Sequence, residues 1–438
     1  MPHILLLGTL DTKCDETLYL HSQLQATASR LSTPTPLKIT LIDVGCRETT
    51  HDAITITHNQ LITKYSPNSE KPTKPWDLPR GEAISYLTSC ASWCIASLLE
   101  TTEVHGIVGT GGSGGTSLIS AAMRNAAPIG LPKLIVSTVA SGNTGPIVGE
   151  CDITLMYSVV DIAGSNRLLR DVLGNAAGAI VGMASAYEQR LTTQRNTAAE
   201  TGEQESRKTR IGITMFGVTT PCVHQIRQHL ESNYAVEVYV FHATGHGGKA
   251  MERLVSEGHL DAVLDITTTE ICDLIVGGNM ACDESRLETP LKRGIPNIIS
   301  VGATDMVNYG PMDSVPPRYK EGGRKLLAHN PSVTLMRTEP GECKKIGEFI
   351  VDKVSTFAKD RGMVEVWVPG GAVSGISGRG GPFEDREADE VLFGALREGL
   401  QGKVRVVEDE REVNDGGFAV DVAERLMGLV GKYQGRKG

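Results

Sequence analysis

The chain has 438 residues, of which 40% are hydrophobic and 22% charged, and this composition excludes a protein that is disordered throughout. Its 52 Asp and Glu against 43 Lys and Arg give a net charge of −9, which argues against a protein that coats nucleic acid or binds anionic membranes. The 49 glycines predict many tight turns and ligand-binding loops.

No apolar run approaches the roughly 18 residues of a membrane-spanning helix, and the first 13 residues lack a basic leader and a cleavage site. The nine cysteines are scattered and form no CxxC pair, so we expect reduced thiols. These features predict a cytoplasmic protein with neither nucleic acid nor membrane as partner.

The first half of the chain alternates strands and helices. Short β-branched runs at residues 3–7, 38–42, 104–108, 133–137 and 153–156 predict strands, and residues 166–189 repeat apolar side chains at helical spacing. Residues 63–79 contain four prolines and predict an excursion, either a lid or an inert insertion. Residues 192–210 have no apolar side chain larger than Ala, so we expect a linker there.

A second series of strands is predicted at residues 211–216, 236–241, 262–266, 297–301, 333–336 and 364–368. The expected fold class is therefore α/β, with two Rossmann-like three-layer subdomains that have mainly parallel sheets. Their predicted bounds are 1–191 and 211–438. Ligands of such sheets bind at the carboxyl ends of the strands.

The glycine-rich loop GTGGSGGT lies between a predicted strand and a helical run. Inward-facing amides and a helix N-terminus would bind phosphate or carboxylate, although neither the P-loop nor the GxGxxG spacing is matched. A tight turn that binds nothing is the alternative. The candidate residues are Gly109, Thr110, Gly111, Gly112, Ser113, Gly114, Gly115 and Thr116.

Further polar residues follow the other predicted strands of the first half. Lys13 could neutralise phosphate and Asp11 could hold a hydrated Mg²⁺, but Asp11 or Thr12 could equally cap a helix. Asp43 is placed to accept ribose hydroxyls, or else it lies in a solvent-facing turn. Thr9, Asp161 and Asn166 complete the candidate nucleotide residues.

The second half contains candidates for covalent chemistry. Cys222 follows the helix-start signal Thr-Thr-Pro, and a thiol in a first helical turn is expected to have a lowered pKa. With His246, His329 and Glu270 as candidate catalytic partners, Cys222 could attack a small carboxylate or carbonyl substrate, as in a hydrolase or lyase. The alternative is that Cys222 is a buried packing residue.

Eight motifs, in order along nearly the whole chain, resemble the amino-terminal ATP-binding domain of the tobamovirus-resistance protein family. They are GTLDTK, GTGGSGGT, DIAGSN with LGNAAGAIVGM, MFGVTTPCV, FHATGHGGKAME, DITTTE, VGATDMVNYG and HNPSVTLMRT.

The resemblance implies two Rossmann-like subdomains, ATP with Mg²⁺ bound mainly by the first, and a homodimer. Plant members of the family continue into a barrel that resembles phosphoenolpyruvate hydrolases, for which this chain has no room after residues 418–438. Its activity would be absent or supplied in trans by a separate barrel protein. The antiviral role of the plant member is not transferred to this chain.

Three functions therefore compete: a Mg-ATP-binding protein, a Cys222-dependent enzyme, and a scaffolding dimer. The first two are compatible, because each would use a different half of the chain.

Overall fold

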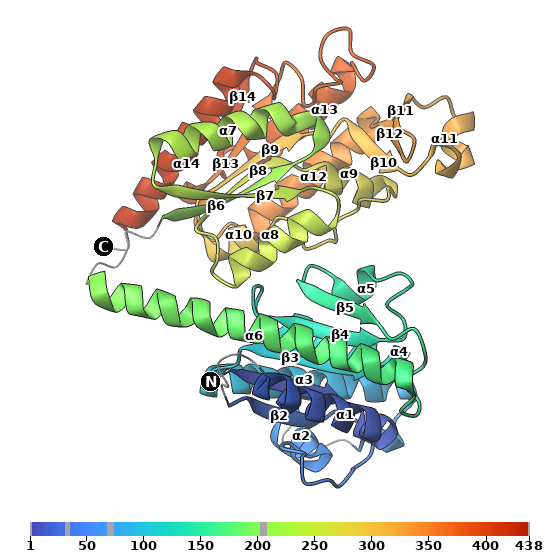
Figure 1. Cartoon of the computed structure of the whole chain (residues 1–438). Coiled ribbons are helices and arrows are strands. Elements are labelled where there is room, and N and C mark those ends of the chain that lie inside the picture. Colours follow the sequence, from blue (N-terminus) through green and yellow to red (C-terminus); the bar gives the residue numbers. More distant parts are fainter. Residues whose placement is uncertain (1, 31–35, 68–73, 202–207, 437–438) are drawn as a thin grey trace. The chain divides into compact units, whose positions relative to one another are not determined.

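The computed structural model describes residues 2–30, 36–67, 74–201 and 208–436, apart from the side chains of 197–201. Two compact units divide the chain, residues 1–205 and 206–438 (Figure 1). The boundary lies inside the segment that composition predicts as a linker. Residues 192–201 of that segment continue a helix instead of starting a separate connection, because Ala, Glu, Gln and Arg are good helix formers.

The N-terminal unit is built on a five-stranded parallel sheet with the order β2-β1-β3-β4-β5. Its strands are β1 (His3–Gly8), β2 (Lys38–Asp43), β3 (Gly106–Gly111), β4 (Lys133–Ser137) and β5 (Ile153–Tyr157). Its helices are α1 (Leu10–Ser29), α2 (His58–Lys64), the short η1 (Pro75–Asp77), α3 (Arg80–Thr101), α4 (Ser113–Ala126), α5 (Gly145–Val148) and α6 (Arg167–Thr201).

Strand β1 shows why this unit has three layers. Every residue of β1 is buried, so both faces of the strand need a cover. Ile4 and Leu6 pack with residues of α1 and α6, whereas Leu5 and Leu7 pack with residues of α3 and α4. Figure 1 shows α1 and α6 on one face of the sheet and α3 and α4 on the other.

The C-terminal unit is built on a six-stranded parallel sheet with the order β14-β13-β9-β8-β6-β7, next to a three-stranded antiparallel sheet with the order β10-β12-β11. The strands are β6 (Thr209–Met215), β7 (Val236–His242), β8 (Ala262–Thr267), β9 (Asn297–Gly302), β10 (Met306–Tyr309), β11 (Leu326–Asn330), β12 (Val333–Arg337), β13 (Val364–Pro369) and β14 (Arg405–Asp409).

The helices of this unit are η2 (Gly217–Thr219), α7 (Thr220–Asn233), α8 (His246–Ser256), α9 (Thr269–Val276), α10 (Glu288–Arg293), η3 (Met312–Ser314), α11 (Pro317–Glu321), α12 (Pro340–Phe357), η4 (Arg361–Met363), α13 (Arg386–Leu400) and α14 (Gly416–Gly435). Residues of α7 and α14 cover one face of the parallel sheet, and residues of α9, α10, α12 and α13 cover the other.

The predicted fold class is confirmed, since both main sheets are parallel and lie between helical layers. One predicted strand is misplaced: residues 333–336 belong to β12 of the small antiparallel sheet, not to the parallel series. The prediction for residues 63–79 falls partly on 68–73, which lie outside the described residues.

The strand orders place one switch point in each unit. The chain leaves β1 toward β2 on one side and then crosses to β3 on the other side of β1. In the C-terminal unit, β7 and β8 flank β6 in the same way. Loops that follow the strands diverge at such points, which is where open α/β sheets bind ligands.

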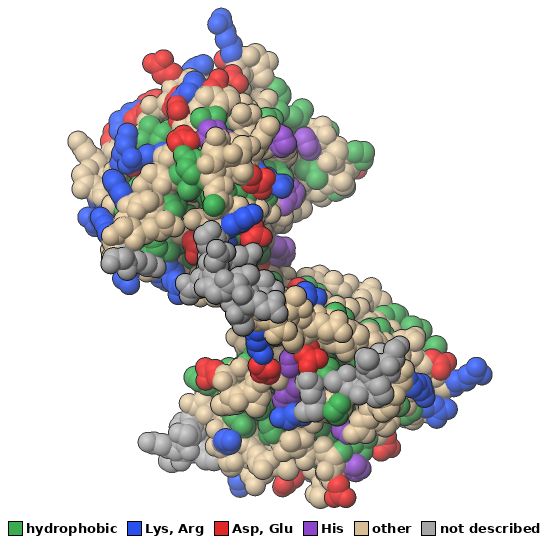
Figure 2. Space-filling view, turned by 60° about the vertical axis from the view of Figure 1, so that its left-hand side comes forward, with side chains coloured by type: hydrophobic (Ala, Val, Ile, Leu, Met, Phe, Trp, Pro, Cys, Tyr) green, Lys and Arg blue, Asp and Glu red, His purple; other side chains and the backbone are tan. Residues whose placement is uncertain are grey.

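Charged side chains of both signs are mixed on the visible surface of each unit (Figure 2). On the face shown in Figure 2, acidic and basic side chains are interspersed over each unit. Among the described residues, no helix is long and apolar enough to cross a membrane.

Candidate functional site

A cleft of about 860 Å³ lies at the switch point of the N-terminal unit. The loop after β1, the start of α4 and the loops after β2, β4 and β5 all contribute to its walls. The sequence-predicted residues that line it are Thr9, Asp11, Thr12, Lys13, Gly112, Ser113, Gly114, Gly115 and Asp161.

The glycine-rich loop brings the start of α4 into this cleft. Helix α4 begins at Ser113, four residues earlier than the pattern predicts, so residues 113–116 form its first turn. A methyl group on Gly111 would lie 2.7 Å from the backbone of Gly115 and Thr116, and one on Gly109 would lie 2.7 Å from Ile119 Cγ2. These two glycines therefore let the helix approach the strand and do not line the cleft.

Thr110 and Thr116 are predicted ligand residues, but both lie inside the unit and away from the cleft. Both are fully buried, and Thr116 Oγ1 donates to the carbonyl of Gly111 at 3.0 Å and contacts Ser137 Oγ at 2.7 Å. Thr116 thus ties the first turn of α4 to β3 and β4. Because neither threonine lines the cleft, a direct ligand contact is not supported for them.

The loop after β1 is shaped by a kink at Lys13. This residue has non-helical angles (φ −134°, ψ 35°) and separates the first turn of α1 from the rest of the helix. Lys13 and Asp11 both line the cleft. Asp11 Oδ2 accepts a hydrogen bond from the backbone amide of Cys46 at 2.9 Å, which links this loop to the one after β2.

Asp43 supports the cleft from behind and does not line it. Its side chain is fully buried, and Oδ1 accepts hydrogen bonds from the amides of Leu10 at 3.2 Å and Gly45 at 2.9 Å. Oδ2 has no hydrogen-bond partner, and burial raises the pKa of this carboxyl to about 6. The expected contact with ribose is therefore wrong: Asp43 joins the two loops that carry Asp11 and Cys46.

The rim of the cleft after β5 contains a strained residue. Val159 has a φ of +65°, which is unfavourable for a β-branched side chain, and its neighbours close a tight turn in which the Val160 amide donates to the Ser158 carbonyl at 2.7 Å. Asn166 lies beyond this rim, where its Oδ1 accepts from the amide of Leu169 at the start of α6. Asn166 is therefore a helix cap rather than a ligand residue.

Half of the residues that line the cleft belong to no motif of the sequence. Arg80 is the first residue of α3 and follows the proline-rich segment, so no motif marked it. The other missed residues are mostly apolar and sit on helices or at strand ends. They are Val44, Cys46, Ile84, Leu118, Thr138, Val139, Val159 and Val160.

In the C-terminal unit, Cys222 does not have the environment of a nucleophile. Its side chain is fully buried among residues of α7 and α14, and burial raises the pKa of the thiol to about 12. The amide of Cys222 donates to Asn414 Oδ1 at 3.2 Å, so this helix start already has an acceptor. The expected lowered pKa is wrong, because removal from water outweighs the effect of the helix N-terminus.

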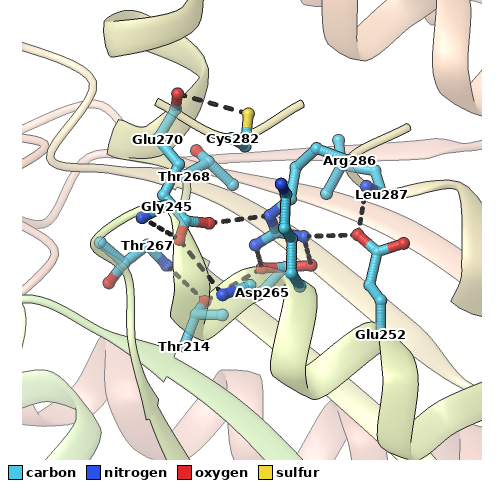
Figure 3. A network of polar contacts seen from close by, with 12 residues as sticks. Thr214, Gly245, Glu252, Asp265, Thr267, Thr268, Glu270, Cys282, Arg286 and Leu287 are labelled. Atoms are coloured by element: carbon cyan, nitrogen blue, oxygen red, sulfur yellow. Dashed lines mark hydrogen bonds and ion pairs between the residues drawn. The ribbon is translucent and has the colours of Figure 1, made fainter. Parts of the chain in front are cut away.

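Glu270 is part of a buried ionic network around Arg286 (Figure 3). Arg286 Nε donates to Glu270 Oε2 at 2.9 Å, and its guanidinium also pairs with Asp265 and, at 3.2 Å, with Glu252. Glu270 Oε1 accepts from the amides of Gly245 and Gly248 at the start of α8.

Glu270 thus occupies the helix N-terminus that the motif GHGGK forms. A methyl group on Gly248 would overlap the carboxylate of Glu270 and the guanidinium of Arg286. The glycines of this loop therefore make room for an internal anion. Glu270 is a structural residue, and its role as a catalytic partner is not supported.

The two candidate histidines lie on the surface, His246 at the start of α8 and His329 on strand β11. Neither can form a nucleophile–base pair with a thiol that is sealed in the core. Among the side chains that the structure describes, no three or more His, Cys, Asp or Glu residues form a metal-binding group.

Family models match both halves of the chain. Residues 2–189 match the N-terminal domain of the uncharacterised protein family UPF0261, and residues 208–430 match its C-terminal domain. The chain belongs to the UPF0261 family.

Relatives of this family occur in bacteria and plants. A UPF0261 protein of Clostridium tetani is 39% identical over 430 residues, which cover 98% of this chain and 99% of the relative. The ToMV resistance protein Tm-1(GCR237) of Solanum lycopersicum is also 39% identical, over 97% of this chain but only 55% of the tomato protein. Among solved structures, a UDP-GlcNAc 2-epimerase from Neisseria meningitidis covers 68% of this chain and 82% of its own, at 10% identity and a TM-score of 0.19, which is too low to carry an argument.

The buried carboxyl of Asp43 predicts a pH-dependent stability of the N-terminal unit. Burial raises the pKa of this carboxyl from 3.8 to about 6 in the folded state. The neutral carboxyl therefore contributes fully to the free energy of unfolding below pH 4, and this contribution is lost as the pH rises through 6. This loss amounts to ~3 kcal/mol at most. Asp43→Asn should not show it, so the variant should gain stability relative to the wild type between pH 4 and 7. Urea unfolding of both proteins across this range measures the difference, and a constant difference would contradict the prediction.

The network around Arg286 predicts that the C-terminal unit needs this guanidinium. Arg286→Met leaves three buried carboxylates without their counter-ion and should cost about 3 to 5 kcal/mol. Trp367, the buried tryptophan of this unit, reports its unfolding by fluorescence. The matched control is Arg293→Met, which removes an exposed arginine of the same unit and should change stability little. Equal effects of the two changes would refute the central role of Arg286.

Proposed function

We propose that the N-terminal unit binds Mg-ATP in its cleft. The proposal rests on one observation: an accessible helix start and two cationic side chains line the same cleft. The first turn of α4 lines the cleft with Gly112, Ser113 and Gly114, and Lys13 and Arg80 line the same cleft. Helix N-termini and cationic side chains both attract phosphate.

The apolar part of the wall suits the rest of a nucleotide. Five apolar side chains of the wall offer contacts to a base, namely Val44, Ile84, Leu118, Val139 and Val160. A volume of about 860 Å³ lies within the range of cofactor sites, roughly 300–1,000 Å³. The family resemblance specifies ATP among the nucleotides that such a cleft would accept.

The carboxylates of the cleft support a role for Mg²⁺. Asp11 and Asp161 are its acidic residues, and they balance the charges of Lys13 and Arg80. A divalent cation would make the cleft net positive and so favour a polyanion. Mg²⁺ commonly uses one or two carboxylates together with phosphate oxygens and water, which these residues fit. We therefore expect nucleotide and metal to bind together.

The proposal concerns binding, and a homodimer and a barrel protein in trans remain expectations from the resemblance. The Cys222 chemistry is not proposed, since this thiol is fully buried. The antiviral property in the name of the tomato relative is not extended to this chain.

Calorimetric titration with ATP, with and without Mg²⁺, tests the proposal, and a phosphate-release assay on the same sample detects turnover. Gly112→Leu should weaken ATP binding by about 10-fold or more, equivalent to ~1.4 kcal/mol. The backbone of Gly112 (φ −72°, ψ −164°) accepts a side chain, and the nearest atom to a methyl group there is Thr138 Oγ1 at 3.9 Å. The leucine should therefore enter the cleft without disturbing the fold.

Gly178→Leu is the matched control. Gly178 is exposed on α6, and a methyl group there would have no atom within 4 Å. Both variants should keep the thermal unfolding temperature of the wild type within a few degrees. Unchanged ATP affinity of Gly112→Leu, or no binding by the wild type, would refute the proposed site.

A further inference from the structure

Two cations in the cleft have no carboxylate partner. Among the residues that the structure describes, neither Lys13 nor Arg80 forms an ion pair with Asp or Glu, although both line a cleft that also contains Asp11 and Asp161. Charged side chains that line a cleft without partners are characteristic of ligand sites rather than of stability.

Arg80 places its positive charge beside two helix starts. Arg80 is the first residue of α3, and its guanidinium lies beside the first turn of α4: a methyl group on Gly114 would be 3.5 Å from Nη2. Each helix start carries partial positive charge. The guanidinium and the two helix starts therefore add up to a positive potential that attracts an anion to this part of the cleft.

The cationic groups come from three separate elements. Lys13 belongs to the kinked start of α1, Arg80 to α3, and the amides of residues 113–115 to α4. A single phosphate at the start of α4 would satisfy the amides there but would not need cations from two further elements. A chain of phosphates would use all three groups.

We propose that Arg80 binds the terminal phosphates of a nucleoside triphosphate and thereby makes the cleft select triphosphates over monophosphates. This inference rests on the proposed function and assigns a specificity role to a residue that no motif marks. The planar guanidinium can donate two parallel hydrogen bonds to phosphate oxygens, which a lysine cannot. Lys13, in the kinked start of α1, adds a second positive charge to the same cleft.

The test compares ATP, ADP and AMP by calorimetry, each with Mg²⁺, for the wild type and Arg80→Met. The variant should lose ATP affinity on the order of 10- to 100-fold, as expected for hydrogen bonds to a charged group, while AMP affinity changes less than about 3-fold. Arg80→Lys should recover only part of the loss, because it restores charge without the planar fork. Arg80 is exposed, so these variants should unfold at the temperature of the wild type.

Arg47→Met is the matched control. Arg47 is also exposed and adjoins Cys46 of the cleft wall, but it does not line the cleft itself. Its removal changes the local charge by the same amount and should alter the affinity for each nucleotide by less than about 3-fold.

The outcomes separate the two proposals. A wild type that binds none of the three nucleotides overturns the proposed function and the selectivity together. A wild type that binds ATP, combined with an Arg80→Met variant that loses ATP and AMP affinity by the same factor, or loses neither, overturns the role of Arg80 alone. If Arg47→Met and Arg80→Met lower the ATP affinity equally, Arg80 acts only through its positive charge and not through contacts with the terminal phosphates. This result also contradicts the inference.

Discussion

The close approach of helix α4 to strand β3 is the constraint on which the N-terminal unit depends. Side chains at Gly109 and Gly111 would collide with Ile119 and with the backbone of α4, so glycine at both positions lets the helix start directly at the end of the strand. Thr116 then fixes this start to β3 and β4 through its hydroxyl group. The amides at the helix start therefore open into the space between the diverging loops of β1 and β3, instead of being covered by connecting chain.

The two units use the same local chemistry in opposite ways. Each has a glycine-rich helix start next to the switch point of a parallel sheet, α4 in one and α8 in the other. At α8 the protein supplies its own anion, because Glu270 accepts from the amides of Gly245 and Gly248 and is held by Arg286. At α4, the amide-bearing turn lines a cleft instead. A glycine-rich loop therefore indicates an anion-binding helix start, but the anion can be internal.

The sequence predicts the buried strands well, but it does not predict contacts between residues that are distant along the chain. The buried strands were predicted to within a few residues, because continuous apolar runs bounded by glycine or polar residues leave few alternatives. The sequence pattern does not predict β11 and β14, which are partly or largely exposed, or β10, which has only four residues. Strand β12 carries the pattern of a core strand although it pairs antiparallel. Cys222 and Glu270 were misassigned for a common reason: burial and a partner distant in sequence decide their chemistry, and neither is visible in a local motif. Arg80 was missed because its place in the cleft depends on how α3 packs beside α4.

The strained turn at Val159 determines the shape of the cleft rim after β5. A β-branched residue at positive φ carries about 1–3 kcal/mol of local strain. Strain of this size persists only where the surrounding structure holds the backbone in place, so the turn around Val159 is fixed by its neighbours. Val159 and Val160 both line the cleft. The hydrogen bond from the Val160 amide to the Ser158 carbonyl closes the turn and sets the direction in which these two valines face the cleft. The shape of this part of the rim is therefore set by backbone strain and one hydrogen bond, whereas the wall at the start of α4 is set by helix packing.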